Sequence, residues 1–214
     1  MKAGKDLKSR CLWACLVLLT PMKIAVAQDY STLDVREKLV VANNILAMEG
    51  LVGPFGHVSV RMQKEGKFRI SDHRSPNEVT VDHIKEVKID ITPEAVEQQD
   101  LYREVFFHSS IYRELPEVNA VVHTHAPFAV ALGTLQLSHN KVLPTTNPGA
   151  NLEQAVLRAI YLEFEARTQI RSHSAGEPIP YTASESDLFK RTVAVEHAWH
   201  YYVDRFRQSE KKKP

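Results

Sequence analysis

A mostly apolar run from Val118 to Val122 ends in the triplet His123-Thr124-His125, and an apolar, helix-like segment begins at Pro127. Side chains two residues apart in a strand point to the same face, so the two imidazoles are expected side by side at the end of a buried strand. This pattern favours a buried strand that is followed directly by a packed helix. The paired imidazoles could hold one divalent metal ion, or they could be structural histidines within the core.

The rest of the chain alternates strand and helix patterns. Strands are expected at 57–62, 67–71 and 87–91, helices at about 31–49, 100–115, 127–135, 152–171 and 185–208, one helical turn at 80–85, and a loop at 134–150. In the helix at 152–171, four apolar residues stand at core spacing: Leu157, Ile160, Tyr161 and Phe164. The alternation predicts a layered α/β domain around one sheet.

Residues 1–27 have the composition of a secretory signal peptide. A basic leader precedes a mostly apolar stretch, and Ala25-Val26-Ala27 matches a cleavage pattern. We therefore expect export to the periplasm or beyond, with a single domain at 28–214. Both cysteines, Cys11 and Cys15, lie in this leader. A metal in the mature chain would then have to bind histidine and carboxylate groups.

The bulk composition excludes some classes of partner. The 214-residue chain has 25% charged residues and a net charge of +1, with its basic residues scattered among acidic ones. Such a balance is not typical of a nucleic-acid-binding protein. After signal cleavage we expect no membrane association, and a small molecule is the expected binding partner.

A carboxylate precedes the histidine pair in the sequence. Glu104 and His108 are four residues apart on the expected helix 100–115, so they share a helix face. A metal-binding pair beside a carboxylate can support lyase chemistry on a carbonyl compound. Alternatively, Glu104 pairs with Arg103 or Lys88 on the surface and His108 is a packing residue.

Two further segments could bind substrate. His57, Ser59 and Arg61 follow Gly56 and would share one face of a strand, where they could hold an oxyanion. His73 and Arg74 lie in a polar loop and could bind a carboxylate. The alternatives are a plain edge strand with one polar face and a solvated loop.

Together these motifs resemble the class II aldolase/adducin family. The matching stretches are 56–61, Ile70-Ser71, 104–112, 118–127 and the helix that begins at Asn151. The resemblance implies a three-layer α/β/α fold around one central, largely antiparallel sheet. It also implies a homo-oligomer, usually a tetramer, with active sites near subunit interfaces.

The resemblance assigns roles to particular residues. His123 and His125 match the first two ligands of Zn²⁺, or of another divalent metal such as Mn²⁺. Glu104 matches the carboxylate that acts as proton shuttle or as metal partner beside them. Ser71 falls in a matched segment and joins His57, Ser59, Arg61, His73 and Arg74 as a candidate substrate contact. A metal-stabilised enediolate in such enzymes serves aldol cleavage, epimerisation or decarboxylation, and the sequence leaves these reactions open.

Three departures from the family pattern affect the function. His57 replaces an asparagine that helps to bind phosphate, and Tyr102-Arg103 replaces a pair of serines. A phosphate cradle needs small residues and free amides, so an unphosphorylated hydroxy-carbonyl or hydroxy-acid substrate is expected. The usual third ligand, a histidine before glycine, has no counterpart in 134–151, where His139 is the histidine that could replace it. Alternatively, His123 and His125 with Glu104 could form a set of two histidines and one carboxylate. The rival hypotheses are a non-catalytic, adducin-like relative and an unrelated metal-binding module.

Overall fold

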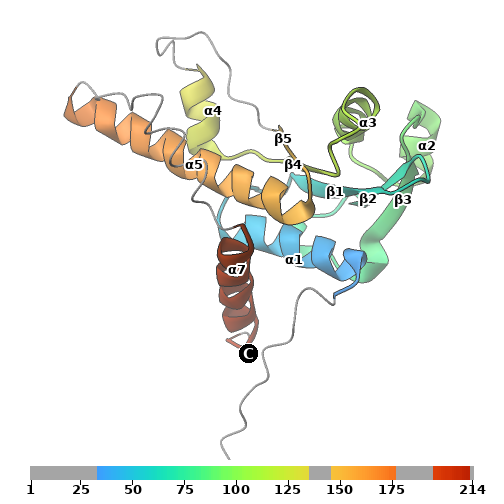
Figure 1. Cartoon of the computed structure of the whole chain (residues 1–214), viewed down its shortest axis with the longest axis horizontal. Helices are drawn as coiled ribbons and strands as arrows, with labels where there is room; N and C mark the ends of the chain where they lie inside the picture. The colour runs from blue at the N-terminus through green and yellow to red at the C-terminus, as the bar shows by residue number, and fades with distance from the viewer. Residues whose placement is uncertain (1–32, 135–145, 177–194, 213–214) are drawn as a thin grey trace, which may run out of the picture. The chain divides into compact units, whose positions relative to one another are not determined.

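A five-stranded antiparallel sheet lies at the centre of the computed structural model (Figure 1). The structure describes residues 33–134, 146–176 and 195–212, which all fall in a unit that spans 32–214. The strands are β1 (His57–Met62), β2 (Lys67–Ser71), β3 (Ile84–Lys88), β4 (Ala120–His123) and β5 (Thr146–Gly149), in the order β3-β2-β1-β4-β5. The predicted signal peptide at 1–27 and the candidate ligand His139 lie outside the described residues.

Helices cover both faces of this sheet. The described helices are α1 (Val35–Met48), α2 (Pro93–Gln98), α3 (Val105–Glu114), α4 (Pro127–Thr134), α5 (Leu152–Ala175) and α7 (Val195–Glu210). Figure 1 shows α3 on one side of the strands and α1 on the other. The expected three-layer arrangement around an antiparallel sheet is therefore confirmed.

Alternation along the strands separates two apolar layers. Phe68, Ile70 and Val121 join Val105 and Tyr112 of α3 in one core cluster. Residues at odd positions of β1 share this face, because Ser59 pairs with Ile70 on one side and with Val121 on the other. Each fully buried side chain of this size contributes about 1.5–3 kcal/mol to stability.

The helix expected at 100–115 begins later than predicted, and a separate helix precedes it. Thr92 accepts a hydrogen bond from the backbone N–H of Ala95 and Pro93 occupies the first turn, so α2 forms at Pro93–Gln98. Asp100 then adopts a left-handed conformation with φ of 52°. That conformation ends the helical path, and α3 begins only at Val105.

Two strand predictions were also wrong. β3 runs from Ile84 to Lys88 rather than 87–91, because the preceding helical turn covers only Val81–His83. The segment expected as loop contains β5 (Thr146–Gly149), in which all residues except Thr146 are poor strand formers. Pairing with β4 places them in the sheet despite that weak local preference.

The buried face of α5 also differs from the prediction. Leu157 and Ile160 are buried as expected, but Tyr161 and Phe164 are 37% and 58% exposed. Glu163 takes a buried position because its carboxylate accepts hydrogen bonds from the backbone N–H groups of Phe128 and Ala129, at 3.1 and 2.8 Å. This acceptor satisfies the first turn of α4, which follows the histidine triplet.

We expect Glu163→Ala to lower the free energy of unfolding by about 3 kcal/mol, because it leaves backbone donors at the start of α4 without an acceptor. Urea unfolding followed by circular dichroism measures the change. Glu165→Ala is the control, since Glu165 is exposed on the same helix. A loss that is no greater for Glu163→Ala than for the control would contradict this role.

In the part of the chain that the structure describes, no helix has the length and apolarity needed to cross a membrane.

Candidate active site

The candidate site begins with two adjacent strands that each present a histidine. In the antiparallel pairing of β1 and β4, His57 lies directly opposite His123, so both side chains emerge on the face covered by α3. Their ring centroids are 5.1 Å apart. His125 lies two residues beyond the end of β4, with its ring centroid 5.0 Å from that of His123 and nearly perpendicular to it. The sheet therefore brings three imidazoles together.

A series of hydrogen-bonded polar side chains begins at His57 and runs into the core. Nδ1 of His57 is hydrogen-bonded to Nε2 of His108 at 2.9 Å, and Nδ1 of His108 to Oγ of Ser59 at 2.6 Å. Oγ of Ser59 lies 2.7 Å from the hydroxyl of Tyr112. All four residues are buried. Satisfied buried networks of this kind fix side-chain orientation, so the ring of His57 is held by the core.

Burial keeps these histidines neutral. Desolvation, reinforced by the neighbouring histidines, lowers the pKa of His57 well below its ordinary value. Burial is also the main cause that lowers the pKa of His108 to about 3. The pKa of His123 is lowered by burial and by His125, against an opposing effect of Glu104. Neutral imidazole is the form that binds metals.

The neutral state of His108 makes stability depend on pH. In the unfolded chain its ring binds a proton near pH 6.5, whereas the folded-state pKa is about 3. Its contribution is therefore complete above about pH 6.5 and is lost as the pH falls toward 3. We expect this group alone to lower the free energy of unfolding by about 1.4 kcal/mol per pH unit between pH 6 and 4.

Urea unfolding of the wild type and of His108→Gln at several pH values measures this dependence. Glutamine can hydrogen-bond within the network but does not titrate, so its pH slope should be shallower. Equal slopes in the two proteins would contradict the assignment.

Glu104 lies near this cluster. It is the residue before α3, half-buried, and its side chain makes no capping hydrogen bond. Its charge acts on His123 and on Tyr102, where it helps to raise the pKa of the phenol. The carboxylate is therefore near enough to His123 to act on it electrostatically, and it is not used to cap its helix.

Tyr102 separates His57 from the loop histidine. Its ring centroid is 4.7 Å from that of His57 and 4.5 Å from that of His73. Its hydroxyl donates to the backbone carbonyl of Arg74, and burial is the main cause that raises its pKa to about 12. The structure thus brings His73 and Arg74 to the edge of the histidine cluster through Tyr102.

The remaining predicted substrate contacts lie elsewhere or are occupied. Ser59 is engaged by His108 and Tyr112. Arg61, four residues beyond His57 on β1, donates to the carbonyl groups of Val118, Tyr112 and Leu115, which include the carboxyl end of α3. Ser71 follows Ile70, the partner of Ser59, so its side chain points to the opposite face of the sheet. We therefore place Ser59 and Arg61 in the framework of the fold, and Ser71 on the sheet face away from the histidines.

Sequence reasoning named His108 without its partners, and it missed Tyr112 and Thr146. His108 and Tyr112 are four apart on α3 and both contact Ser59, a spacing that could have indicated a shared partner. Thr146 of β5, whose Oγ1 lies 3.2 Å from Nδ1 of His123, gave no signal, because its strand was not expected.

The histidine pair fits a divalent metal in donor type and in spacing. Two imidazoles bound to one tetrahedral zinc ion have centroids about 5 Å apart, given Zn–N distances of about 2.0–2.1 Å. His123 and His125 have that separation. Among the described residues, no three His, Cys, Asp or Glu side chains are grouped so as to hold an ion together. The pair therefore fits, and a third ligand has to move toward it.

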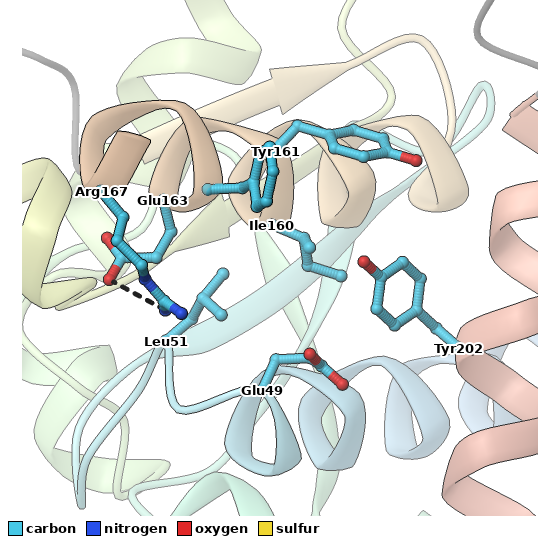
Figure 2. Close-up of a pocket in the computed structure, with 8 residues that line it drawn as sticks. Glu49, Leu51, Ile160, Tyr161, Glu163, Arg167 and Tyr202 are labelled. Atoms are coloured by element: carbon cyan, nitrogen blue, oxygen red, sulfur yellow. Dashed lines mark ion pairs between the residues drawn. The ribbon is translucent and has the colours of Figure 1, made fainter. Parts of the chain in front are cut away.

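A separate pocket of about 250 Å³ lies between α5, α7 and the end of α1 (Figure 2). Figure 2 shows Tyr202 and Glu49 facing Ile160 across it, with the ion pair between Arg167 and Glu163 at one end. None of the cluster histidines lines this pocket. Its link to the site is indirect. Glu163 of α5 lines the pocket, and its carboxylate accepts a hydrogen bond from the backbone at the start of α4.

Comparison with known proteins identifies the fold and the family. Residues 37–151, just over half of the chain, match the sequence profile described as the class II aldolase and adducin N-terminal domain. The chain belongs to the class II aldolase and adducin family. Its matched segment includes Glu104 and both histidines of the pair.

Solved structures of other class II aldolase family proteins share this fold. An aldolase II superfamily protein from Pseudomonas syringae superposes with a TM-score of 0.68 at 18% identity, covering 82% of this chain and 92% of that one. L-fuculose 1-phosphate aldolase from Glaciozyma antarctica gives a TM-score of 0.65 at 21% identity, covering 81% and 87%. At these identities the likeness establishes the fold alone.

Another relative of this chain is the decarboxylase tropJ of Talaromyces stipitatus. The two are 32% identical over 116 residues, which is 53% of this chain but 39% of the relative. This chain therefore matches well under half the length of that enzyme.

Proposed function

We propose that this protein is a divalent-metal-dependent lyase that breaks a carbon–carbon bond next to a carbonyl group. The observation that carries the proposal is the adjacency of His123 and His125 at the end of β4, with the charge of Glu104 acting on His123. Family membership and the similarity to a decarboxylase support this general class of reaction.

Each group has a distinct role in this proposal. His123 and His125 would hold Zn²⁺ or Mn²⁺. When bound, such an ion supplies Lewis-acid polarisation of a carbonyl oxygen. The carboxylate of Glu104 would carry a proton to or from the carbon beside the carbonyl. Phe55 and Phe107, both 54% exposed, have rings 6.3 Å from His125 and 6.0 Å from His123 and would shield that carbon from water.

The substrate we propose is a small, unphosphorylated hydroxy-carbonyl compound or hydroxy acid. The side chain of Tyr102 occupies the space between His57 and His73, where a phosphate cradle would need small residues and free amides. His73 and Arg74 at the edge of the cluster are suited to orient a carboxylate. The decarboxylase relative makes a hydroxy or keto acid the first substrate class to test.

The test combines metal analysis with assays for two products. The purified chain is freed of metal, reloaded with zinc or manganese, and incubated with hydroxy acids while carbon dioxide and aldehyde release are both followed. We expect about one metal ion per chain and metal-dependent release of one of these products. Failure to bind either metal, with no turnover, would favour the non-catalytic, adducin-like alternative.

Export also remains a proposal. We expect expression in a bacterial host to give a mature protein that begins at Gln28, because Ala25-Val26-Ala27 matches a signal-peptidase site. The mass of the intact protein recovered from the periplasm measures this, and an uncleaved mass would contradict it. Ala27→Arg is the control, since it removes the small residue that the peptidase requires. Assembly as a tetramer likewise remains a prediction from the family.

A further inference from the structure

We propose that His57 supplies the third imidazole ligand of the metal site, in place of a ligand from the segment after α4. This inference rests on the proposed function, which requires a metal held by His123 and His125. It assigns a role to a residue whose position in the family pattern is an asparagine. The argument depends on strand register, on ring separation and on how the other nitrogen of each ring is used.

Strand register places the ring of His57 beside the pair. His57 and His123 are cross-strand partners on one face, a relation set by backbone hydrogen bonding rather than by side-chain choice. Their centroids are 5.1 Å apart, against 5.0 Å between His123 and His125. Both separations match the roughly 5 Å expected for imidazoles that share a zinc ion. His123 thus has two other imidazoles at this separation, that of His57 nearly parallel to it at 20° and that of His125 nearly perpendicular at 88°.

The hydrogen bonds of His57 and His123 use the same nitrogen, Nδ1, in each ring and leave Nε2 for a metal. Nδ1 of His123 lies 3.2 Å from the hydroxyl of Thr146, and Nδ1 of His57 lies 2.9 Å from Nε2 of His108. A metal-binding histidine normally donates its second N–H to such a partner, which fixes the tautomer. In the tautomer in which both Nδ1 atoms donate, the Nε2 lone pair of each ring is free for a metal.

The donor chain behind His57 can support this tautomer throughout. If Nδ1–H of His57 donates to Nε2 of His108, then Nδ1–H of His108 can donate to Ser59 Oγ. The Ser59 hydroxyl can in turn donate to the oxygen of Tyr112. Each of these three hydrogen bonds then has one donor and one acceptor, so the chain is compatible with a neutral His57 whose Nε2 carries no proton.

A small movement would complete the site. The described residues contain no group of three metal-binding side chains already gathered around one point. His57 and His123 are buried and held by hydrogen bonds, whereas His125 is exposed and lies beyond the strand end. His125 is therefore the ring that can turn toward an ion held by the other two. Three imidazoles would then leave one position open for substrate.

Zinc affinity of the purified chain provides the first test. The wild type, His57→Asn and a control, His173→Asn, are titrated with Zn²⁺ against a chromophoric chelator; His173 is exposed near the end of α5. We expect His57→Asn to bind zinc about 100-fold more weakly or worse and the control to match the wild type. Asparagine can still hydrogen-bond to His108, and circular dichroism checks that the variant is folded.

A second measurement needs no variant. X-ray absorption at the zinc edge of the wild-type protein counts the imidazole ligands, and we expect three. Spectra of the His57→Asn protein loaded with zinc should show one imidazole fewer. A wild-type site whose imidazole count is unchanged in folded His57→Asn, or equal zinc affinity in the two proteins, overturns the role of His57 and leaves the lyase proposal intact. A wild type that binds no zinc overturns both.

Discussion

Glu104→Gln is expected to lower kcat by about 1,000-fold while leaving the zinc content unchanged. General acid–base catalysis by a positioned side chain contributes roughly 10²–10⁴-fold to rate, and glutamine keeps the shape of glutamate without its ability to carry a proton. Glu104 precedes α3, makes no capping hydrogen bond and acts electrostatically on His123. Its substitution should therefore affect proton transfer more than folding.

Steady-state kinetics with metal analysis of the same preparations measures this effect. Glu117→Gln is the matched control, because Glu117 is exposed in the turn after α3. Full activity in folded, zinc-loaded Glu104→Gln would remove Glu104 from the mechanism. Loss of zinc together with activity would instead make the carboxylate a metal ligand.

His123→Asn is expected to abolish both stoichiometric zinc binding and turnover. The ring centroids of His57 and His125 lie 5.1 and 5.0 Å from that of His123, so its loss removes the ring that the other two share as a neighbour. Removing a ligand should weaken zinc binding by at least about 100-fold, more than loss of an outer-shell partner. Asparagine fits the strand end and can still contact Thr146.

Metal analysis after gel filtration in a weak chelator measures the zinc that each protein retains. His197→Asn is the control, since that histidine is exposed on α7. Retention of one zinc ion per chain by His123→Asn would show that the metal, if catalytic, is held by another set of residues.

The structure shows where two departures from the family pattern, His57 and Tyr102, lie relative to the histidine pair. His57 and Tyr102 are adjacent buried rings, and both stand where smaller or amide side chains are expected in sugar-phosphate enzymes. Together they replace polar space near the histidine pair with aromatic surface. That replacement is consistent with a substrate that carries a carboxylate or no charged group in place of a phosphate.

Some elements could be predicted locally and others could not. β1, β2 and α4 follow clear alternation or a proline start, and their observed bounds are close to those predicted. β5 could not be found this way, because Asn147, Pro148 and Gly149 are poor strand formers and the segment is held by its pairing with β4. Tyr161 and Phe164 have helical core spacing, yet the buried carboxylate of Glu163 fixes the inward side of α5.

The sequence by itself determined the histidine triplet, the neighbouring Glu104 and the layered α/β class, because side-chain period and residue chemistry are local properties. Only the tertiary structure decided that His57 faces His123, that Arg61 serves the framework, and that His108, Ser59 and Tyr112 form one buried chain. Strand register and burial depend on contacts between distant segments, and no local pattern encodes them.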